Sequence, residues 1–283
     1  MHSPGRGPGR ASSAKRAGTI ALALSVLALS VLALAAAAPA QASRLGALKR
    51  MVGGTEAAHP NALWHIVHGL CLRDMRASGN PAPCTEVNLA GRYAVVKDVE
   101  RRTQYLLVPT VRVSGIESPE LLAAGAPNYW QAAWTSRRWL EQQTGRPIPR
   151  EDIGLAINSV DGRTQNQLHI HIDCVRPEVL SALRGQAAGI GTRWSRMRIS
   201  LEGRRYRVRW IRGADLSGAD PFKLLARADP VARAEMGRQT LAVIAGVRPD
   251  GSPGFFLLSD RSDDDQGVAA EQLLDHRCQV LSQ

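Results

Sequence analysis

One short stretch in the middle of the chain, residues 165–174, restricts the possible folds more than any other part of the sequence. Polar and apolar residues alternate along it, which predicts a β-strand whose successive side chains point to opposite faces. The polar face carries Gln167, His169, His171 and Asp173. The apolar face carries Leu168, Ile170, Ile172 and Cys174. We expect one face to pack on a core and the other to present two imidazoles and a carboxylate.

Three interpretations of His169 and His171 are open on these residues alone. They are surface side chains without a role, they ligate a metal such as zinc together with a carboxylate, or one of them is a nucleophile or acid–base group. We favour the third, because the neutral amides of Asn158 and Gln165 occur nearby and suit a phosphate whose charge rearranges in the transition state. We therefore expect no metal and no cofactor.

The order of the expected elements indicates an α+β fold. A helix over residues 62–71 precedes two strands over residues 89–96 and 103–109, which we expect to form a hairpin. A helix over residues 128–144 and a strand over residues 153–158 follow. These elements surround the alternating stretch with partners for both of its faces.

Two further features bear on the core. The helix over residues 128–144 carries Trp130, Trp134 and Trp139, which we expect in the core, with an amphipathic membrane edge as the alternative. The C-terminal part, residues 176–283, is rich in expected strands and either packs on the first part or repeats its architecture. Those strands are residues 199–203, 206–211, 241–247 and 254–259.

The N-terminus has the features of an export signal. A basic segment, residues 6–16, precedes a mostly apolar run, residues 19–38, and small residues follow. The run is long for a cleaved signal and long enough to span a bilayer, so we favour a retained anchor over cleavage. In both cases the positive flank stays inside, which leaves the body on the non-cytoplasmic side of the inner membrane or free in the periplasm. We assign residues 1–42 to the signal or anchor, 43–60 to a linker and 61–283 to the folded body.

Four cysteines in an exported chain favour two disulfides. The sequence allows three pairings of Cys71, Cys84, Cys174 and Cys278. We rank Cys71–Cys84 with Cys174–Cys278 first, because the first pair closes a local loop that contains glycine and prolines.

The formal net charge of +11 suggests an anionic partner, such as phosphate groups, an anionic membrane or nucleic acid. Nucleic acid is the weakest of these, because the basic residues are dispersed and an exported chain rarely meets it.

The alternating stretch resembles the histidine triad superfamily, whose strand reads His-φ-His-φ-His-φ-φ. His169 and His171 match its first two histidines, and Asp173 stands at the third. Asn158 and Gln165 match an upstream asparagine and glutamine. Together with the leader and three further segments, the stretch is similar over roughly residues 60–280 to a membrane-associated branch, the CDP-diacylglycerol pyrophosphatases. The further segments are residues 104–109, with Gln104 in place of a histidine, 115–119 and 220–222.

The resemblance implies a histidine-triad-like antiparallel sheet with helices, extended by a strand-rich C-terminal half. It implies hydrolysis of CDP-diacylglycerol, a membrane lipid, to CMP and phosphatidate, and a chain that pairs as a homodimer. The alternatives are a broader nucleotide-pyrophosphate hydrolase or nucleotidyltransferase of the triad type, and a non-catalytic envelope protein that binds metal or lipid.

The resemblance also implies a role for each matched residue. His171 attacks the phosphorus and forms a nucleotidyl-histidine, while His169 orients it or holds the phosphate. Asn158, Gln165 and Gln104 bind the substrate, and Asp98, aligned through a gap, corresponds to the acid that binds ribose. Asp173 replaces the histidine that helps the leaving group depart, so it either acts in protonated form or orients His171.

Overall fold

One antiparallel sheet organises the part of the protein that the computed structural model describes, residues 59–263 and 267–282. Its strands follow the order β1-β2-β3-β5-β4-β8-β9-β7-β6, and β10 pairs with β5. The strands are β1 (Glu86–Asn88), β2 (Tyr93–Lys97), β3 (Tyr105–Pro109), β4 (Ile153–Ile157), β5 (Ile170–Val175), β6 (Ser195–Arg196), β7 (Arg207–Arg212), β8 (Gln239–Val247), β9 (Pro253–Arg261) and β10 (Leu274–Asp275). The C-terminal strands extend the first sheet through the β4–β8 pair.

Helices cover both faces of this sheet, which gives the α+β architecture that the sequence predicted. The longer helices are α4 (Tyr129–Ser136), α5 (Arg138–Thr144), α6 (Pro177–Gln186) and α7 (Pro221–Ala228). An N-terminal helical segment consists of α2 (Ala62–Trp64), η1 (His65–Leu72) and α3 (Arg73–Ser78). Short helices are η2 (Pro119–Leu122), η3 (Arg150–Asp152), η4 (Val160–Gly162), η5 (Ala187–Gly189), α8 (Pro230–Ala234), η6 (Met236–Arg238), η7 (Ala270–Leu273) and η8 (Gln279–Ser282).

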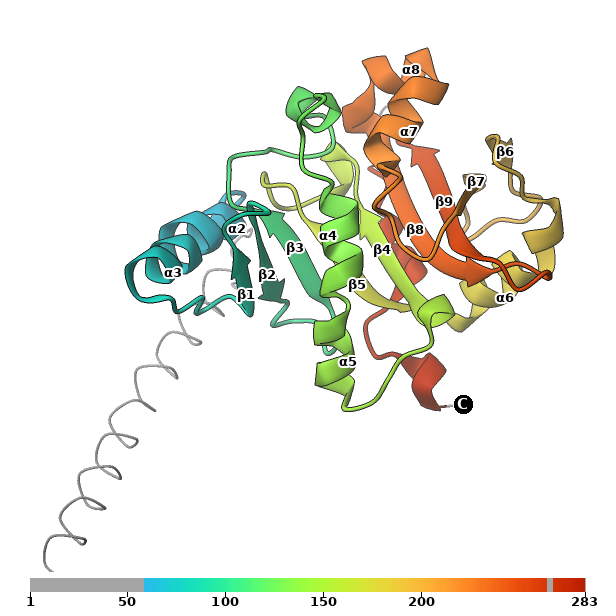
Figure 1. Ribbon diagram of the computed structural model, residues 1–283. Coiled ribbons are helices and arrows are strands. Elements are labelled where there is room, and N and C mark those ends of the chain that lie inside the picture. The colour runs from blue at the N-terminus through green and yellow to red at the C-terminus, as the bar shows by residue number, and fades with distance from the viewer. Residues whose placement is uncertain (1–58, 264–266, 283) are drawn as a thin grey trace, which may run out of the picture. The chain divides into compact units, whose positions relative to one another are not determined.

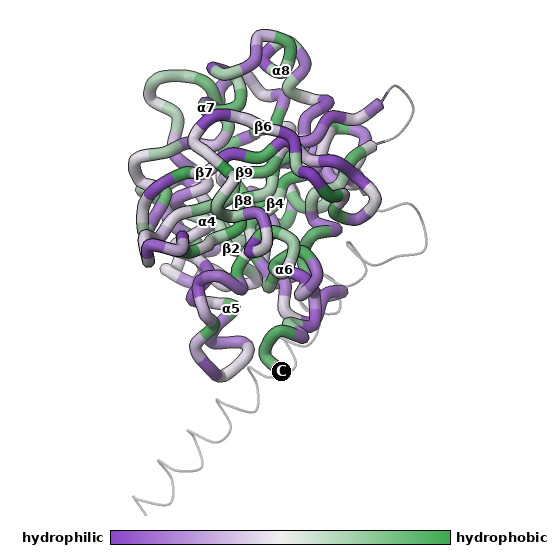
Figure 2. The backbone as a smooth tube through the Cα atoms, turned by 90° about the vertical axis from the view of Figure 1, so that its right-hand side faces the viewer, coloured by the Kyte–Doolittle hydropathy of each residue, from purple (hydrophilic) through white to green (hydrophobic). Residues whose placement is uncertain are grey.

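Helix α4 lies across one face of the sheet in Figure 1 and packs on the apolar side of β5. Trp130 and Trp134 of α4 are buried in the same cluster as Ile170 and Ile172. The core interpretation of these two tryptophans is therefore confirmed, and the alternative of a membrane edge is wrong for them. Figure 2 shows the central strands as hydrophobic, which agrees with a sheet that is covered on both faces.

The opposite face of the sheet is covered in two separate places. The N-terminal helical segment packs on β2 and β3 with Ile66 and Val67. Helix α6 packs with Leu180 and Leu183 on β8 and β9. The polar side of β5 faces the region between these two packed areas, because its apolar side already faces α4.

Two predicted elements differ from the structure. The strand expected over residues 165–174 begins only at Ile170, because the chain before it bonds through the side chain of Gln167. The Gln167 amide nitrogen donates to the carbonyl oxygens of Pro109 (3.0 Å) and Val111 (2.9 Å), and the backbone N–H of Leu168 donates to the carbonyl oxygen of Val113 (2.7 Å), beyond the end of β3. The hairpin expected over residues 199–211 is present with a different first strand. The chain turns between Leu201 and Arg204, which form an isolated antiparallel bridge, but the strand that pairs with β7 across this turn is β6, which lies before residue 199.

The helix predicted over residues 128–144 is divided into α4 and α5 at Arg137, and it ends at Gly145 in the left-handed conformation (φ 72°). The predicted hairpin before it is present, with Tyr93 opposite Pro109 and Lys97 opposite Tyr105.

Both disulfides of the pairing ranked first are present, Cys71–Cys84 and Cys174–Cys278. The second joins residues 104 positions apart and ties the C-terminal segment to β5. The predicted signal or anchor over residues 1–42 lies outside the described residues. Within the described ranges, none of the helices has the length and apolar character needed to cross a bilayer.

Candidate active site

A hollow of 380 Å³ opens on the face of the sheet that α4 leaves free, and it gathers most of the predicted site. The predicted residues that line it are Asp98, Gln104, Asn158, Gln165, His169 and His171. Asp173 is the exception, because its side chain is fully buried beneath this surface. The hollow lies where the end of β2, the centre of β5 and the end of β4 meet.

His171 lies at the centre of this arrangement because β5 has a strand on each side. Its neighbours across the ladders are Leu106 of β3 and Ala156 of β4. Neither ring nitrogen has a hydrogen-bond partner among the described residues. Glu271 approaches, with Oε2 3.1 Å from Nδ1, but without the alignment of a hydrogen bond.

The ring of His171 is neutral near neutral pH. Burial lowers its pKa to about 3, the charges of His276 and Arg101 act in the same direction, and Asp98 opposes them. A neutral imidazole keeps one nitrogen lone pair available for attack on an electrophile.

His169 is fixed by the backbone before the strand. Its Nδ1 lies 2.7 Å from the carbonyl oxygen of Gln167, so Nδ1 carries the proton and donates it. The ring meets that of His171 edge to face, with ring centroids 5.0 Å apart. Burial lowers the pKa of His169 to about 4, and the neighbouring His171 contributes to the same shift.

Asp173 faces the same side of β5 but is bonded below the hollow. Its carboxylate accepts hydrogen bonds from Thr103 Oγ1 (2.7 Å) and from the backbone N–H of Cys174 (2.9 Å). Its second oxygen, Oδ2, lies 2.9 Å from Nδ1 of His276. Burial raises the pKa of Asp173, and the hydrogen bonds from His276 and Thr103 oppose this rise.

Arg163 lines the hollow and is held there by a bidentate ion pair with Glu117. Arg163 donates to both carboxylate oxygens of Glu117, at 2.6 and 2.7 Å, and its side chain is only 5% exposed. Gly115 makes room for this pair, because a Cβ atom there would lie 1.8 Å from Nη1 of Arg163. The pair keeps a guanidinium at the edge of the hollow although it is buried.

A family model described as CDP-diacylglycerol pyrophosphatase matches residues 58–282 of the chain. The chain belongs to the CDP-diacylglycerol pyrophosphatase family. A relative from Yersinia pestis named CDP-diacylglycerol pyrophosphatase is 44% identical over 226 residues, which cover 79% of this chain and 86% of the relative.

Two residues of this CDP-diacylglycerol pyrophosphatase family member escaped the sequence analysis, Glu271 and His276. Glu271 lines the hollow, and its backbone N–H donates to Oδ1 of Asn158 (3.2 Å). His276 lies two positions before Cys278, so the expected bond from Cys278 to Cys174 was a signal that it lies near Asp173. Glu271 had no comparable signal.

The pyrophosphatase segment over residues 115–119 now has a structural explanation, since it contains both Gly115 and Glu117. These residues hold Arg163 against the hollow. Asp220 of the segment 220–222 lies elsewhere, where it accepts a hydrogen bond from the backbone N–H of Phe222 at the start of α7 (3.0 Å).

Proposed function

We propose that the protein hydrolyses the pyrophosphate bond of CDP-diacylglycerol to CMP and phosphatidate through a nucleotidyl-histidine on His171. The main support is the neutral ring of His171, which lines the hollow without a hydrogen-bond partner among the described residues. With Nδ1 turned toward Glu271, the lone pair of Nε2 is the one that attacks.

The first step forms a bond between Nε2 of His171 and the phosphorus of CMP. The bond from that phosphorus to the bridging oxygen breaks, and phosphatidate leaves with the electron pair. Water then attacks the same phosphorus, the P–N bond breaks, and its electron pair returns to the ring of His171. Two half-reactions of this kind replace one difficult displacement by water.

Charged and neutral groups around the hollow suit the two phosphates. Arg163 and Arg101 carry positive charge at the hollow. Oδ1 of Asn158 accepts a hydrogen bond from the backbone N–H of Glu271, so the amide nitrogen of Asn158 is available to donate to a phosphate oxygen. Gln165 is positioned by the backbone N–H of Leu63, which donates to its Oε1 (2.9 Å). Hydrogen-bond donors of this type stabilise the charge that develops during phosphoryl transfer.

Asp98 has the connections expected of a nucleoside-binding acid. Its Oδ1 accepts from the backbone N–H groups of Glu100 (2.9 Å) and Arg101 (3.3 Å), which fixes the carboxylate in the loop after β2. We propose that Oδ2 accepts a hydrogen bond from the ribose of CMP. Gln104 contributes to the same wall from the start of β3.

We also propose a relation to the histidine triad superfamily. It is supported by His169 directly before β5 and His171 on it, by the hairpin β2–β3 beside β5, and by Asn158 and Gln165 at the hollow. Asp173 departs from the triad pattern, because a carboxylate stands where the pattern has a third histidine.

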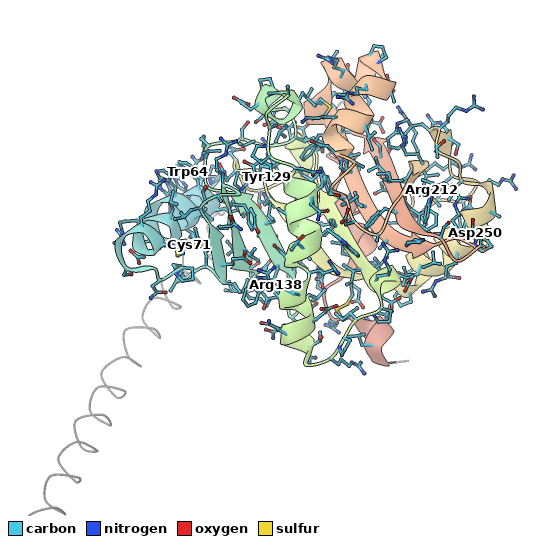
Figure 3. The ribbon with its side chains drawn as sticks, viewed as in Figure 1. Trp64, Cys71, Tyr129, Arg138, Arg212 and Asp250 are labelled. Carbon is cyan, nitrogen blue, oxygen red and sulfur yellow. A yellow bond between two sulfur atoms is a disulfide. The ribbon has the colours of Figure 1, made fainter. Side chains whose placement is uncertain are left out.

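A second hollow next to the first supports action at a membrane surface. It is lined by Trp64, which Figure 3 labels on the N-terminal helical segment, and by Leu89 and Val111, which are 47% and 40% exposed. Its lining also includes three arginines and contains no acidic residue. The arginines are Arg76, Arg92 and Arg112. Apolar side chains mixed with arginine suit an anionic lipid surface, and Leu63 of the active-site hollow precedes Trp64 directly.

The test uses the full-length protein in detergent micelles with CDP-diacylglycerol. We expect CMP release by the wild type, loss of it in His171→Ala, and a CMP adduct on His171 after rapid acid-free denaturation. His65→Ala is the matched control, because His65 is exposed on η1 and does not line the hollow. CMP release near the wild-type rate in His171→Ala would rule out the nucleotidyl-histidine.

A further inference from the structure

The partly exposed side chain of His276 contacts the buried carboxylate of Asp173. The two reaction steps described above do not use this pair. β10 pairs with β5 through Leu274 opposite Val175 and Asp275 opposite Cys174. The next positions in this register are Asp173 and His276, and their side chains meet with Nδ1 2.9 Å from Oδ2. The aspartate that replaces the third triad histidine thus holds a histidine from the C-terminal segment.

Constraints on both sides of His276 hold this contact. On one side Leu274 and Asp275 are paired with β5, and on the other Cys278 is bonded to Cys174. Gly154 of β4 contributes, because a Cβ atom there would lie 2.6 Å from Cδ2 of Leu274. The backbone of His276 is thus held on both sides, and the contact with Asp173 orients its ring.

The proton between the two groups lies on the imidazole. An imidazole is a stronger base than a carboxylate, so the shared proton resides on Nδ1 and is donated to Oδ2. The donors Thr103 Oγ1 and Cys174 N–H on the other oxygen stabilise the ionised carboxylate. This tautomer leaves the lone pair of Nε2 free to accept a proton, as in hydrolases in which an aspartate orients a histidine base.

The ring lies at the border of the active-site hollow. Gln104 lines that hollow, and its side-chain amide lies 3.2 Å from Nδ1 of His276. With the proton on Nδ1, the amide group is oriented so that its oxygen, which can accept, faces the ring. A neighbouring hollow of 440 Å³ is lined by His276 itself, and Arg101 lines both hollows. The His276 side chain is 20% exposed, so it is open to water.

We infer that His276, oriented by Asp173, is the general base that activates the water for hydrolysis of the nucleotidyl-His171. A proton passes from water to Nε2 of His276, the water oxygen bonds to phosphorus, and the P–N bond breaks with its electrons returning to His171. The proton then leaves His276 for solvent through the neighbouring hollow. Asp173 is a positioning residue in this scheme. The inference rests on the proposed function, because it needs the covalent intermediate.

Other groups near His171 are less suited to this step. His171 carries the nucleotide at that stage. His169 also keeps a free Nε2, because its Nδ1 donates to the carbonyl oxygen of Gln167, but its ring is buried and offers a proton a poorer route to solvent than the partly exposed ring of His276. Glu271 faces Nδ1 of His171, where its charge stabilises the ring after phosphorylation of the other nitrogen. His276 combines a fixed tautomer, a free nitrogen and access to solvent.

The experiment separates the two half-reactions in the full-length protein. With His276→Gln and Asp173→Asn, rapid mixing with CDP-diacylglycerol should release one equivalent of phosphatidate at nearly the wild-type rate. CMP release should then be slower by about 10²- to 10³-fold, with a CMP adduct accumulating on the protein. Glu178→Gln is the matched control, because Glu178 lines the same neighbouring hollow and does not contact Asp173 or His276.

A chemical rescue distinguishes lost chemistry from lost structure. In His276→Ala, added imidazole should restore CMP release without changing the phosphatidate burst. The inference is overturned if phosphatidate and CMP release slow equally without an adduct, if CMP release is unchanged, or if imidazole has no effect on a folded variant. Failure of the proposed function looks different, because His171→Ala then stays active and no variant accumulates an adduct.

Discussion

Nδ1 of His171 lies 3.1 Å from Oε2 of Glu271, although the two residues are about a hundred positions apart in the chain. The contact exists because the side chain of Asn158 accepts a hydrogen bond from the backbone N–H of Glu271 and so holds η7 beside β4. A carboxylate in this position favours positive charge on the ring, and such charge develops when Nε2 becomes bonded to phosphorus.

Glu271→Gln should therefore slow the formation of the adduct. As the ring becomes charged, Nδ1–H can form a hydrogen bond to the Glu271 carboxylate that the neutral ring does not make. A hydrogen bond to a charged group contributes about 1.5–3 kcal/mol, so we expect a decrease of about ten- to a hundredfold in the rate of the phosphatidate burst. The measurement is the burst rate at saturating substrate. Glu120→Gln is the control, because Glu120 is exposed on η2. An unchanged burst rate would show that the charge of Glu271 does not contribute to attack by His171.

The pH dependence of kcat/KM should be flat where an ordinary histidine would titrate. Burial lowers the pKa values of His171 and His169 to about 3 and about 4, so both rings stay neutral from neutral pH down to about pH 5. Protonation removes the attacking lone pair, and activity should fall only below that pH. The measurement is kcat/KM for a water-soluble CDP ester between pH 4 and 8. A decrease with a midpoint near pH 6.5 would contradict the burial of His171.

Gly115→Ala should disturb the wall of the hollow. The new Cβ atom would lie 1.8 Å from Nη1 of Arg163, so the pair with Glu117 has to shift. Crowding of this kind costs about 1–3 kcal/mol of unfolding free energy, and we also expect a higher KM. Gly125→Ala is the matched control, since a Cβ atom at Gly125 meets nothing within 4 Å. Denaturant unfolding measures the free energy of unfolding, and steady-state kinetics measure KM. If Gly115→Ala and Gly125→Ala have the same unfolding free energy and the same KM, the close approach of Gly115 to Arg163 is not needed for stability or substrate binding.

The sequence predicted the side-chain directions of β5 because alternation is a local property of an extended chain. His169 and His171 accordingly face one hollow, and Ile170 and Ile172 face α4. The predicted start of the strand was wrong. The side chain of Gln167 donates hydrogen bonds to the carbonyl oxygens of Pro109 and Val111, which lie more than fifty positions earlier in the chain. No periodicity in residues 165–169 reports such a contact.

The acid–base residues of the site could be predicted only in part for a related reason. Asp173 was found because it belongs to the alternating stretch, but its partner His276 lies about a hundred residues later. The pairing of β10 with β5 and the Cys174–Cys278 disulfide bring the two together. The disulfide was predicted, whereas the register that aligns His276 with Asp173 depends on tertiary packing.

Loss of the Cys174–Cys278 disulfide should affect the second half-reaction in particular. Cys174→Ala/Cys278→Ala removes a crosslink that spans 104 residues, which typically costs about 2–5 kcal/mol of stability. In conditions where the variant is folded, we expect slow CMP release after a normal phosphatidate burst, because His276 loses one of its constraints. Cys71→Ala/Cys84→Ala is the control, since that bond joins η1 to the loop before β1 and does not involve β5 or the C-terminal segment. Equal slowing of CMP release in both variants would contradict this assignment.

Leu89→Ser/Val111→Ser should weaken the use of lipid substrate without affecting the chemistry. Both side chains are exposed beside Trp64 and the arginines of the second hollow, where burial in a lipid interface stabilises binding by about 1 kcal/mol for each side chain. We expect KM for CDP-diacylglycerol in mixed micelles to rise by about ten- to thirtyfold, while kcat/KM for a water-soluble CDP ester stays at the wild-type value. Val231→Ser is the matched control, because Val231 is 56% exposed on α8 and outside that hollow. If the double variant and the control have the same KM for the lipid, the surface around Trp64 does not contact the membrane. If the double variant changes kcat/KM for the soluble ester as much as KM for the lipid, Leu89 and Val111 affect the active site itself.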